Sequence, residues 1–395
     1  MSGVFRLPLL LALLASTAPL QGAQRREPEC PWCEKGDAAA IGVVGHGPMP
    51  LLSKDSDDFA RAYSESDWMF LETVHFRLAS SLGGQNLSAK DSKRLEADLE
   101  RLRTAFPKMP KRLRKLDPWL RLHWTAMRLE DFYARFQRLL GVTDADFPES
   151  RGDDPYMGDG RYLGEKEKFE VLLHESRGTH HRATEDNTGV RVTDSMRWHH
   201  RSPHKLVLSV PAVDSDLRQD RWLLPHLVHN LSHAFLAAYK HFSYDPPTWI
   251  DEGLAHAMER EIEPESWTRE GEEGTYQERG RSRPWDQEAR SLVQKDEAPP
   301  LAALMRKHTL GELEADDHVV CWSICRFLID QHPGPLAAFL GGIKGQLDER
   351  GYPSGKDLTG LQRRLLRELW DWSPVDLDQA WREAVAGNPA HFPGP

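Results

Sequence analysis

The chain has 395 residues, of which 39% are hydrophobic and 28% charged, an ordinary composition for a globular protein that builds its own core. Its formal net charge of −10 argues against general nucleic-acid binding, because nucleic acids attract basic surfaces. Beyond the N-terminal segment, no stretch is apolar for long enough to be predicted to span a membrane.

The first residues are typical of an export signal. Arg6 precedes the apolar run 7–14, and small residues follow up to a predicted cleavage site near Ala23. The run is too short to cross a bilayer, so residues 1–23 are predicted to be a signal peptide. An uncleaved anchor is the alternative, because Gln21 suits the third position before the cut poorly. The mature protein is expected to be periplasmic or extracellular.

Residues 24–55 are predicted to be an irregular leader rich in Cys, Gly and Pro. Cys30 and Cys33 frame the sequence C-P-W-C, which can be a redox pair, half of a zinc knuckle or a local disulfide. Haem attachment requires a histidine at the next position, where Glu34 stands. A thioredoxin-like role requires a preceding strand, which this stretch does not predict. A structural disulfide or a small metal knuckle is therefore favoured.

Residues 56–215 are predicted to form an N-terminal α+β lobe. An exposed amphipathic helix is expected over 88–105. The best-marked helix of the chain follows, with Asp117 as its cap, Pro118 in its first turn and Gly141 at its end.

Two short apolar runs, 169–173 and 205–210, predict strands in this lobe. Residues 216–395 are predicted to hold two motif-bearing helices and a helical C-terminal lobe. Pro225 is expected in the first turn of the first motif helix, and residues 249–262 are expected to form the second.

The segment 263–298 is charged and rich in Gly and Arg, which predicts a mobile loop or lid. Beyond it the chain is expected to be helical. Cys321 and Cys325 lie one turn apart on an apolar helix and are expected to be buried thiols. Disulfides are the default in an exported protein, but the sequence does not give the pairing of the four cysteines.

The strongest motif is H-N-L-S-H, which begins at His229 and ends at His233, with Glu252 nineteen residues further on. Two histidines four apart on a helix share one face, which is the geometry that two imidazoles need to bind one Zn²⁺. A glutamate from a following helix completes a His/His/Glu set, which leaves a fourth position open for water. These three residues are the candidate metal ligands.

Asn230 stands where the peptidase motif H-E-x-x-H has the glutamate that acts as general base. An amide does not accept a proton at neutral pH. A positioned general base typically contributes about 10²–10⁴-fold to the rate. The motif therefore predicts a zinc site in which peptide hydrolysis is impaired, and Asn230→Glu is expected to restore peptidase activity if the rest of the site is intact.

The spacing from His229 to Glu252 and the phrase W-I-D-E-G-L-A resemble the gluzincin (peptidase-MA-like) metallopeptidases. Weaker likeness extends to 68–78, similar to an early strand of those domains, to 318–328, similar to the helix after their zinc site, and to Trp381 in a closing helix.

This resemblance implies an α+β fold. A small mixed sheet with helices would form the N-terminal lobe, helices would form the C-terminal lobe, and Zn²⁺ would lie between them, held by His229, His233 and Glu252. The strand 205–210 would be the edge that holds an extended peptide. His318 would stand where related peptidases often carry a tyrosine, as a candidate electrophile; a core histidine satisfied by its neighbours is the favoured alternative.

Three functions follow as hypotheses. The first is a pseudopeptidase that binds zinc and a peptide, protein or cell-envelope ligand without turnover. The second is an active zinc hydrolase with a non-standard base. The third is a metal-free structural or interaction protein. The first is favoured, because Asn230 replaces the base while the ligand set is complete.

Overall fold

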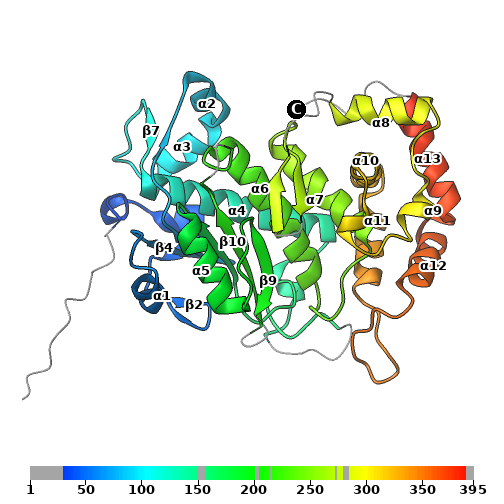
Figure 1. Cartoon of the computed structure of the whole chain (residues 1–395), viewed down its shortest axis with the longest axis horizontal. Coiled ribbons are helices and arrows are strands. Elements are labelled where there is room, and N and C mark those ends of the chain that lie inside the picture. The colour runs from blue at the N-terminus through cyan, green and yellow to red at the C-terminus, as the bar shows by residue number, and fades with distance from the viewer. Residues whose placement is uncertain are drawn as a thin grey trace, which may run out of the picture.

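The computed structural model describes residues 30–149, 156–200, 204–213, 216–271, 274–278 and 284–387. The predicted signal peptide lies outside these residues. The described chain is a mixed α+β structure, as predicted, with a six-stranded sheet in its N-terminal half and helices gathered at the other end (Figure 1). None of the helices in the described ranges combines the length and apolar character that a bilayer crossing requires.

The central sheet has the order β1-β4-β5-β8-β10-β9. Strands β5, β8 and β10 are parallel, and the outer pairings are antiparallel. The six strands are β1 (Val43–Gly45), β4 (Met69–Thr73), β5 (Phe76–Ser80), β8 (Phe169–His174), β9 (Met196–His200) and β10 (Lys205–Pro211). Two-stranded sheets are formed by β2 (Pro50–Leu51) with β3 (Lys54–Asp55), by β6 (Gln85–Asn86) with β7 (Lys115–Leu116), and by β11 (Thr268–Gly271) with β12 (Gly274–Gln277).

Both faces of the sheet are covered. Side chains alternate between the faces, so that Phe70 and Leu172 pack under α1 (Ser56–Ala62) and α5 (Arg177–Thr188). Their neighbours Leu71 and Val171 point the other way, into the main core. There they lie beneath the helices α4 (Pro118–Leu140) and α6 (Asp220–Ala238).

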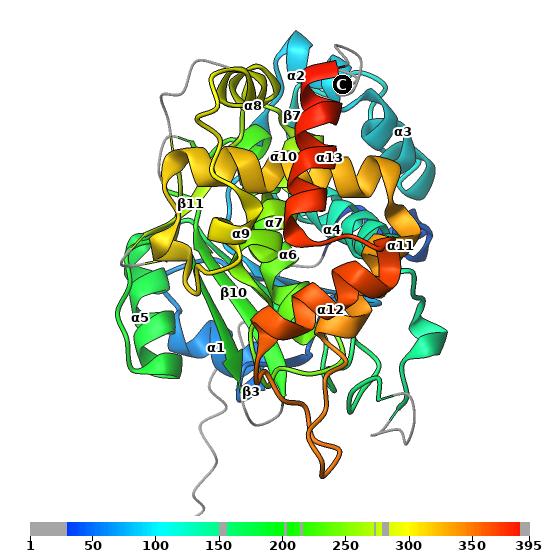
Figure 2. The same ribbon diagram turned by 90° about the vertical axis from the view of Figure 1, so that its right-hand side faces the viewer.

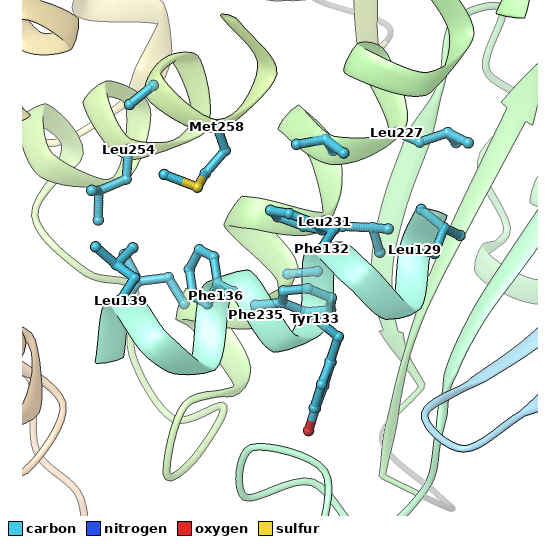
Figure 3. Packing of buried hydrophobic residues seen from close by; sticks show 14 of the residues in the cluster. Leu129, Phe132, Tyr133, Phe136, Leu139, Leu227, Leu231, Phe235, Leu254 and Met258 are labelled. Carbon is cyan, nitrogen blue, oxygen red and sulfur yellow. The ribbon is translucent and has the colours of Figure 1, made fainter. Parts of the chain in front are cut away.

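The helix α4 confirms the prediction of its ends. Asp117 accepts a hydrogen bond from the Leu120 amide, and Gly141 adopts the left-handed conformation that closes the helix. Its apolar face meets α6 and the following helix α7 (Thr248–Ile262), with Phe132, Phe136 and Phe235 at the contact (Figure 3). The motif helices therefore pack against the apolar face of α4.

Helices form the far end of the molecule, as expected for the C-terminal region. Figure 2 shows α13 crossing over α10 there, and Trp381 of α13 donates to Ser323 Oγ of α10 at 3.0 Å. The helices are α8 (Trp285–Gln294), α9 (Leu301–Leu304), α10 (Ala315–Gln331), α11 (Pro333–Ile343), α12 (Leu358–Trp370) and α13 (Pro374–Gly387).

Several predicted elements differ from the observed ones. The leader is not irregular throughout, because β1 joins the central sheet. The helix expected over 88–105 is two helices, α2 (Ala89–Arg94) and α3 (Glu96–Ala105), which meet at Leu95. The strand expected within 68–78 is the hairpin β4–β5.

The segment 263–298 is also more regular than predicted. It contains the hairpin β11–β12 and the helix α8. Pro225 lies inside α6 and not in its first turn, because the helix begins at Asp220. The strand β10 is an internal strand of the sheet, so it cannot offer the free edge that the gluzincin resemblance implied; β9 takes that place.

Candidate metal centre

The helices α6 and α7 bring the three predicted ligands together. His229 and His233 lie one turn apart on α6, and Glu252 projects from the first turns of α7. The two His Nε2 atoms are 3.3 Å apart, and His233 Nε2 is 3.3 Å from Glu252 Oε2. Ligands at zinc bond lengths on a tetrahedron are separated by about 3.3 Å, so these spacings fit one zinc ion.

The carboxylate of Glu252 tests whether a cation suits the centre. Both of its oxygens are buried, and no described residue gives either of them a hydrogen bond of good geometry. Imidazole nitrogens nevertheless approach to 2.9 Å and 3.3 Å. Nitrogens and oxygens that converge without aligned hydrogens are the arrangement expected of ligands around a cation. The residues present fit a bound metal.

Carboxylates also stand behind the two histidines. Asp251 Oδ2 lies 2.8 Å from His233 Nδ1, and Glu259 Oε1 lies 3.5 Å from His229 Nδ1. In metal sites such outer carboxylates fix the imidazole tautomer, so that Nε2 presents its lone pair to the ion. Neither contact was predicted from the sequence, which offers only the position of Asp251 beside Glu252.

His256 is a further member of the centre that the sequence analysis missed. Its Nε2 is 2.9 Å from Glu252 Oε1 and 3.0 Å from His318 Nδ1. Glu252, His256 and His318 therefore form a second set with metal-ligand spacing, which shares Glu252 with the first. The spacing E-x-x-x-H on α7 repeats the i, i+4 geometry of His229 and His233 and was the available signal.

His318 is buried and lies against the same carboxylate, with Nδ1 2.9 Å from Glu252 Oε1. The structure thus brings it to the centre, as the resemblance implied. Its contacts are those of a ligand or a partner of Glu252, and its role as an electrophile stays a prediction.

Asn230 is held away from any role as a base. Its Oδ1 accepts hydrogen bonds from Arg197 at 2.7 Å and from Thr275 at 2.8 Å. Its Nδ2 donates to the backbone oxygen of His226 at 2.9 Å. The side chain is fully buried, and these hydrogen bonds occupy both ends of its amide group, so the amide is not available to activate a water molecule.

The carboxylates around His233 favour positive charge on its imidazole. Burial opposes protonation of His233, but the Asp251 carboxylate outweighs it and raises the pKa of His233 to about 9. Burial would raise the pKa of Glu252, but the neighbouring imidazoles, His256 above all, hold it well below its usual value. The negative charges that favour a proton on His233 would also stabilise a divalent cation.

The hairpin β11–β12 closes this region. Thr275 and Ser195 exchange two backbone hydrogen bonds, of 2.8 Å and 3.1 Å, at the start of the edge strand β9. Ser195 Oγ in turn lies 2.8 Å from His226 Nε2. His229, His233 and Glu252 are each at most 5% exposed, so the centre is closed to bulk solvent in this conformation.

Comparison of the chain with protein-family models, curated proteins and solved structures finds no match. The gluzincin likeness stays a prediction that rests on the motif residues.

Proposed function

We propose that this chain is an exported, gluzincin-like zinc protein whose peptidase activity is absent or strongly impaired. One observation carries the proposal: the residue in the position of the general base, Asn230, is fixed by Arg197 and Thr275. The side chain is therefore part of the structural framework, while the ligand set beside it is complete.

The centre is suited to zinc for three reasons. His229, His233 and Glu252 have the spacing of a tetrahedral site. Asp251 orients the imidazole of His233, and the carboxylate of Glu259 lies 3.5 Å from the other imidazole. The buried carboxylates of Glu252 and Glu259 carry negative charge that a bound divalent cation would offset. A bound zinc ion would supply Lewis acidity and a polarised water.

Because the side chains of the centre are buried from solvent, a binding or structural role is favoured over turnover of a peptide substrate. A peptide substrate must reach the metal and a base together, and here the metal ligands are buried and the base is replaced. The ligand of such a protein would be a peptide, a protein or cell-envelope material held outside the centre.

The first test is the zinc content of the purified protein by elemental mass spectrometry. The double variant His229→Ala/His233→Ala is expected to contain one zinc ion per chain fewer than the wild type. The exposed His308→Ala is the matched control and should lose none. Equal zinc content in the wild type and the double variant, after both are supplied with the metal, would refute the zinc centre.

The second test is hydrolysis of a mixed peptide pool, read by mass spectrometry. The wild type is expected to cleave no faster than the His229→Ala/His233→Ala variant. Cleavage at the rate of an ordinary metallopeptidase, lost in that variant, would overturn the pseudopeptidase assignment and support a hydrolase with another base.

A further inference from the structure

A second cluster of metal-binding side chains lies far along the chain from the motif helices. Cys30 and Cys33 flank the tight turn at the start of the leader, His46 follows β1, and His123 projects from the first half of α4. From the sequence, Cys30 and Cys33 can form a zinc knuckle, a disulfide or a redox pair. The two histidines come from elements that the sequence does not connect with them.

The four side chains converge on one point. Cys30 Sγ is 3.3 Å from His123 Nε2, and Cys33 Sγ is 3.3 Å from His46 Nε2 and 3.5 Å from His123 Nε2. The two Nε2 atoms are 3.4 Å apart, and the two sulfurs 3.0 Å.

These distances match a tetrahedral zinc site with two sulfur and two nitrogen ligands. Zinc bond lengths of about 2.3 Å to sulfur and 2.0 Å to nitrogen give edges of about 3.3 Å between nitrogens and 3.5 Å between sulfur and nitrogen. The observed values agree with both. The sulfur–sulfur edge is the one that must lengthen, by less than about 1 Å.

The scaffold around the cluster is built to hold it. Trp32, inside the C-P-W-C turn, donates to Asp117 Oδ2 at 2.9 Å, while the other oxygen of Asp117 caps α4. The amide of Asp37 donates to Ala105 O at 2.8 Å. At Gly36 a Cβ atom would lie 2.6 Å from Phe106 Cδ1, so only glycine permits this approach of the leader.

Among the described residues, the polar contacts of His123 are made through Nε2 alone. His123 is fully buried, and its Nδ1 has no hydrogen-bond partner among the described residues. A core histidine is normally held by hydrogen bonds at its nitrogens. The polar contacts of His123 are instead made through Nε2, to the two sulfurs and to His46. The aromatic rings of Phe106 and Trp119 surround the pair of imidazoles.

We propose that Cys30, Cys33, His46 and His123 bind one structural zinc ion, which fastens the leader to α4. Four protein ligands fill the tetrahedron, so the site has no open position and no catalytic role. A disulfide between Cys30 and Cys33 would leave both imidazoles directed at sulfur atoms that can no longer act as thiolate ligands of a metal. This site shares no residue with the motif centre formed by His229, His233 and Glu252. The proposal of a structural zinc ion is therefore tested independently of the proposed function.

Cobalt substitution tests the site selectively. A protein loaded with Co²⁺ alone is expected to show a thiolate-to-cobalt charge-transfer band, which the motif centre cannot produce because its ligands are His and Glu. The band should vanish in Cys30→Ser/Cys33→Ser and persist in the control Cys321→Ala/Cys325→Ala. It should also persist in His229→Ala/His233→Ala, which separates this proposal from the previous one.

Zinc content and thiol state give a second readout. Cys30→Ser/Cys33→Ser is expected to contain one zinc ion per chain fewer than the wild type. In the native protein Cys30 and Cys33 should resist alkylation until a chelator is added. An intact mass lower by the two thiol hydrogens would indicate a disulfide, and thiols that alkylate freely without a chelator would indicate an empty site; either result overturns the proposal.

Discussion

The side chain of Asn230 occupies the base position of the motif and belongs to a buried hydrogen-bond network. The sequence predicts that the general base is absent, and the structure adds what replaces it: a buried amide that joins Arg197, Thr275 and the backbone of His226. The motif could not reveal this network, because Arg197 lies on β9 and Thr275 on the hairpin, two elements that the sequence analysis did not identify.

This network alters the expected result of Asn230→Glu. A glutamate here would face the Arg197 guanidinium, which binds carboxylates strongly and would hold the new group ionised and paired. We therefore expect Asn230→Glu to retain zinc and to show no peptidase activity, contrary to the expectation from the motif alone. Peptide-pool hydrolysis by the variant and the wild type checks this, and clear metal-dependent cleavage by Asn230→Glu would disprove the role given to Arg197.

At the scale of elements, the contact between α7 and α10 decides the geometry of the centre. Gly253 follows Glu252 on α7, and a Cβ atom at this position would lie 2.5 Å from both Cys321 O and Cys325 Sγ of α10. Glycine is therefore what lets the two helices approach. The approach in turn brings His318 of α10 to within 2.9 Å of Glu252.

Gly253→Ala should force α10 away from α7. Overpacking of this kind typically costs about 1–3 kcal/mol, and here the displaced helix carries His318. We expect a lower free energy of unfolding together with weaker zinc binding, measured by denaturant titration and by competition with a chromophoric chelator. The control is Gly334→Ala on α11, where a Cβ atom meets nothing within 4 Å. Unchanged stability and zinc affinity in Gly253→Ala would contradict this account of the helix contact.

The elements also show how much of the fold the sequence determines. The helix α4 was predictable because Asp117, Pro118 and Gly141 act locally at its ends. The strand β9, with the sequence M-R-W-H-H, was not, because it has one residue of the β-branched and aromatic types that favour strands, and none of its side chains is fully buried. The proximity of His229 and His233 was predictable from helical spacing, and Glu252 was added from the gap and phrase that resemble gluzincins. His46 and His123 were not, because tertiary packing alone brings them to the cysteines.

For the whole molecule, buried neutral histidines imply sensitivity to acid. Burial, with a smaller effect of Lys344, lowers the pKa of His241 from 6.5 to about 3. Its Nδ1 accepts from the Ser243 amide at 3.2 Å, and its Nε2 lies 3.0 Å from Lys344 O, an arrangement that suits the neutral ring. Burial likewise lowers the pKa of His180 to about 4.

Between the folded-state and ordinary pKa values the unfolded chain binds more protons, so the free energy of unfolding falls as the pH drops from 6.5 toward 4. Each such histidine contributes up to about 1.4 kcal/mol per pH unit. His241→Gln keeps a donor and an acceptor but cannot titrate, so its stability should fall less steeply over this range. Denaturant titrations at pH 7, 5.5 and 4 measure the slope, with His308→Ala as control. Parallel slopes for the wild type and His241→Gln would contradict the assignment.

The hairpin β11–β12 has one more consequence, for the behaviour of the protein at high concentration. An uncovered strand edge is a template on which another chain can add a strand. The first position beside β9 is already taken by Thr275, and the strand itself carries Arg197, His199 and His200. The hairpin that encloses Asn230 therefore also limits strand addition at this edge of the sheet. Its loss would expose the buried amide of Asn230 and the strand edge together.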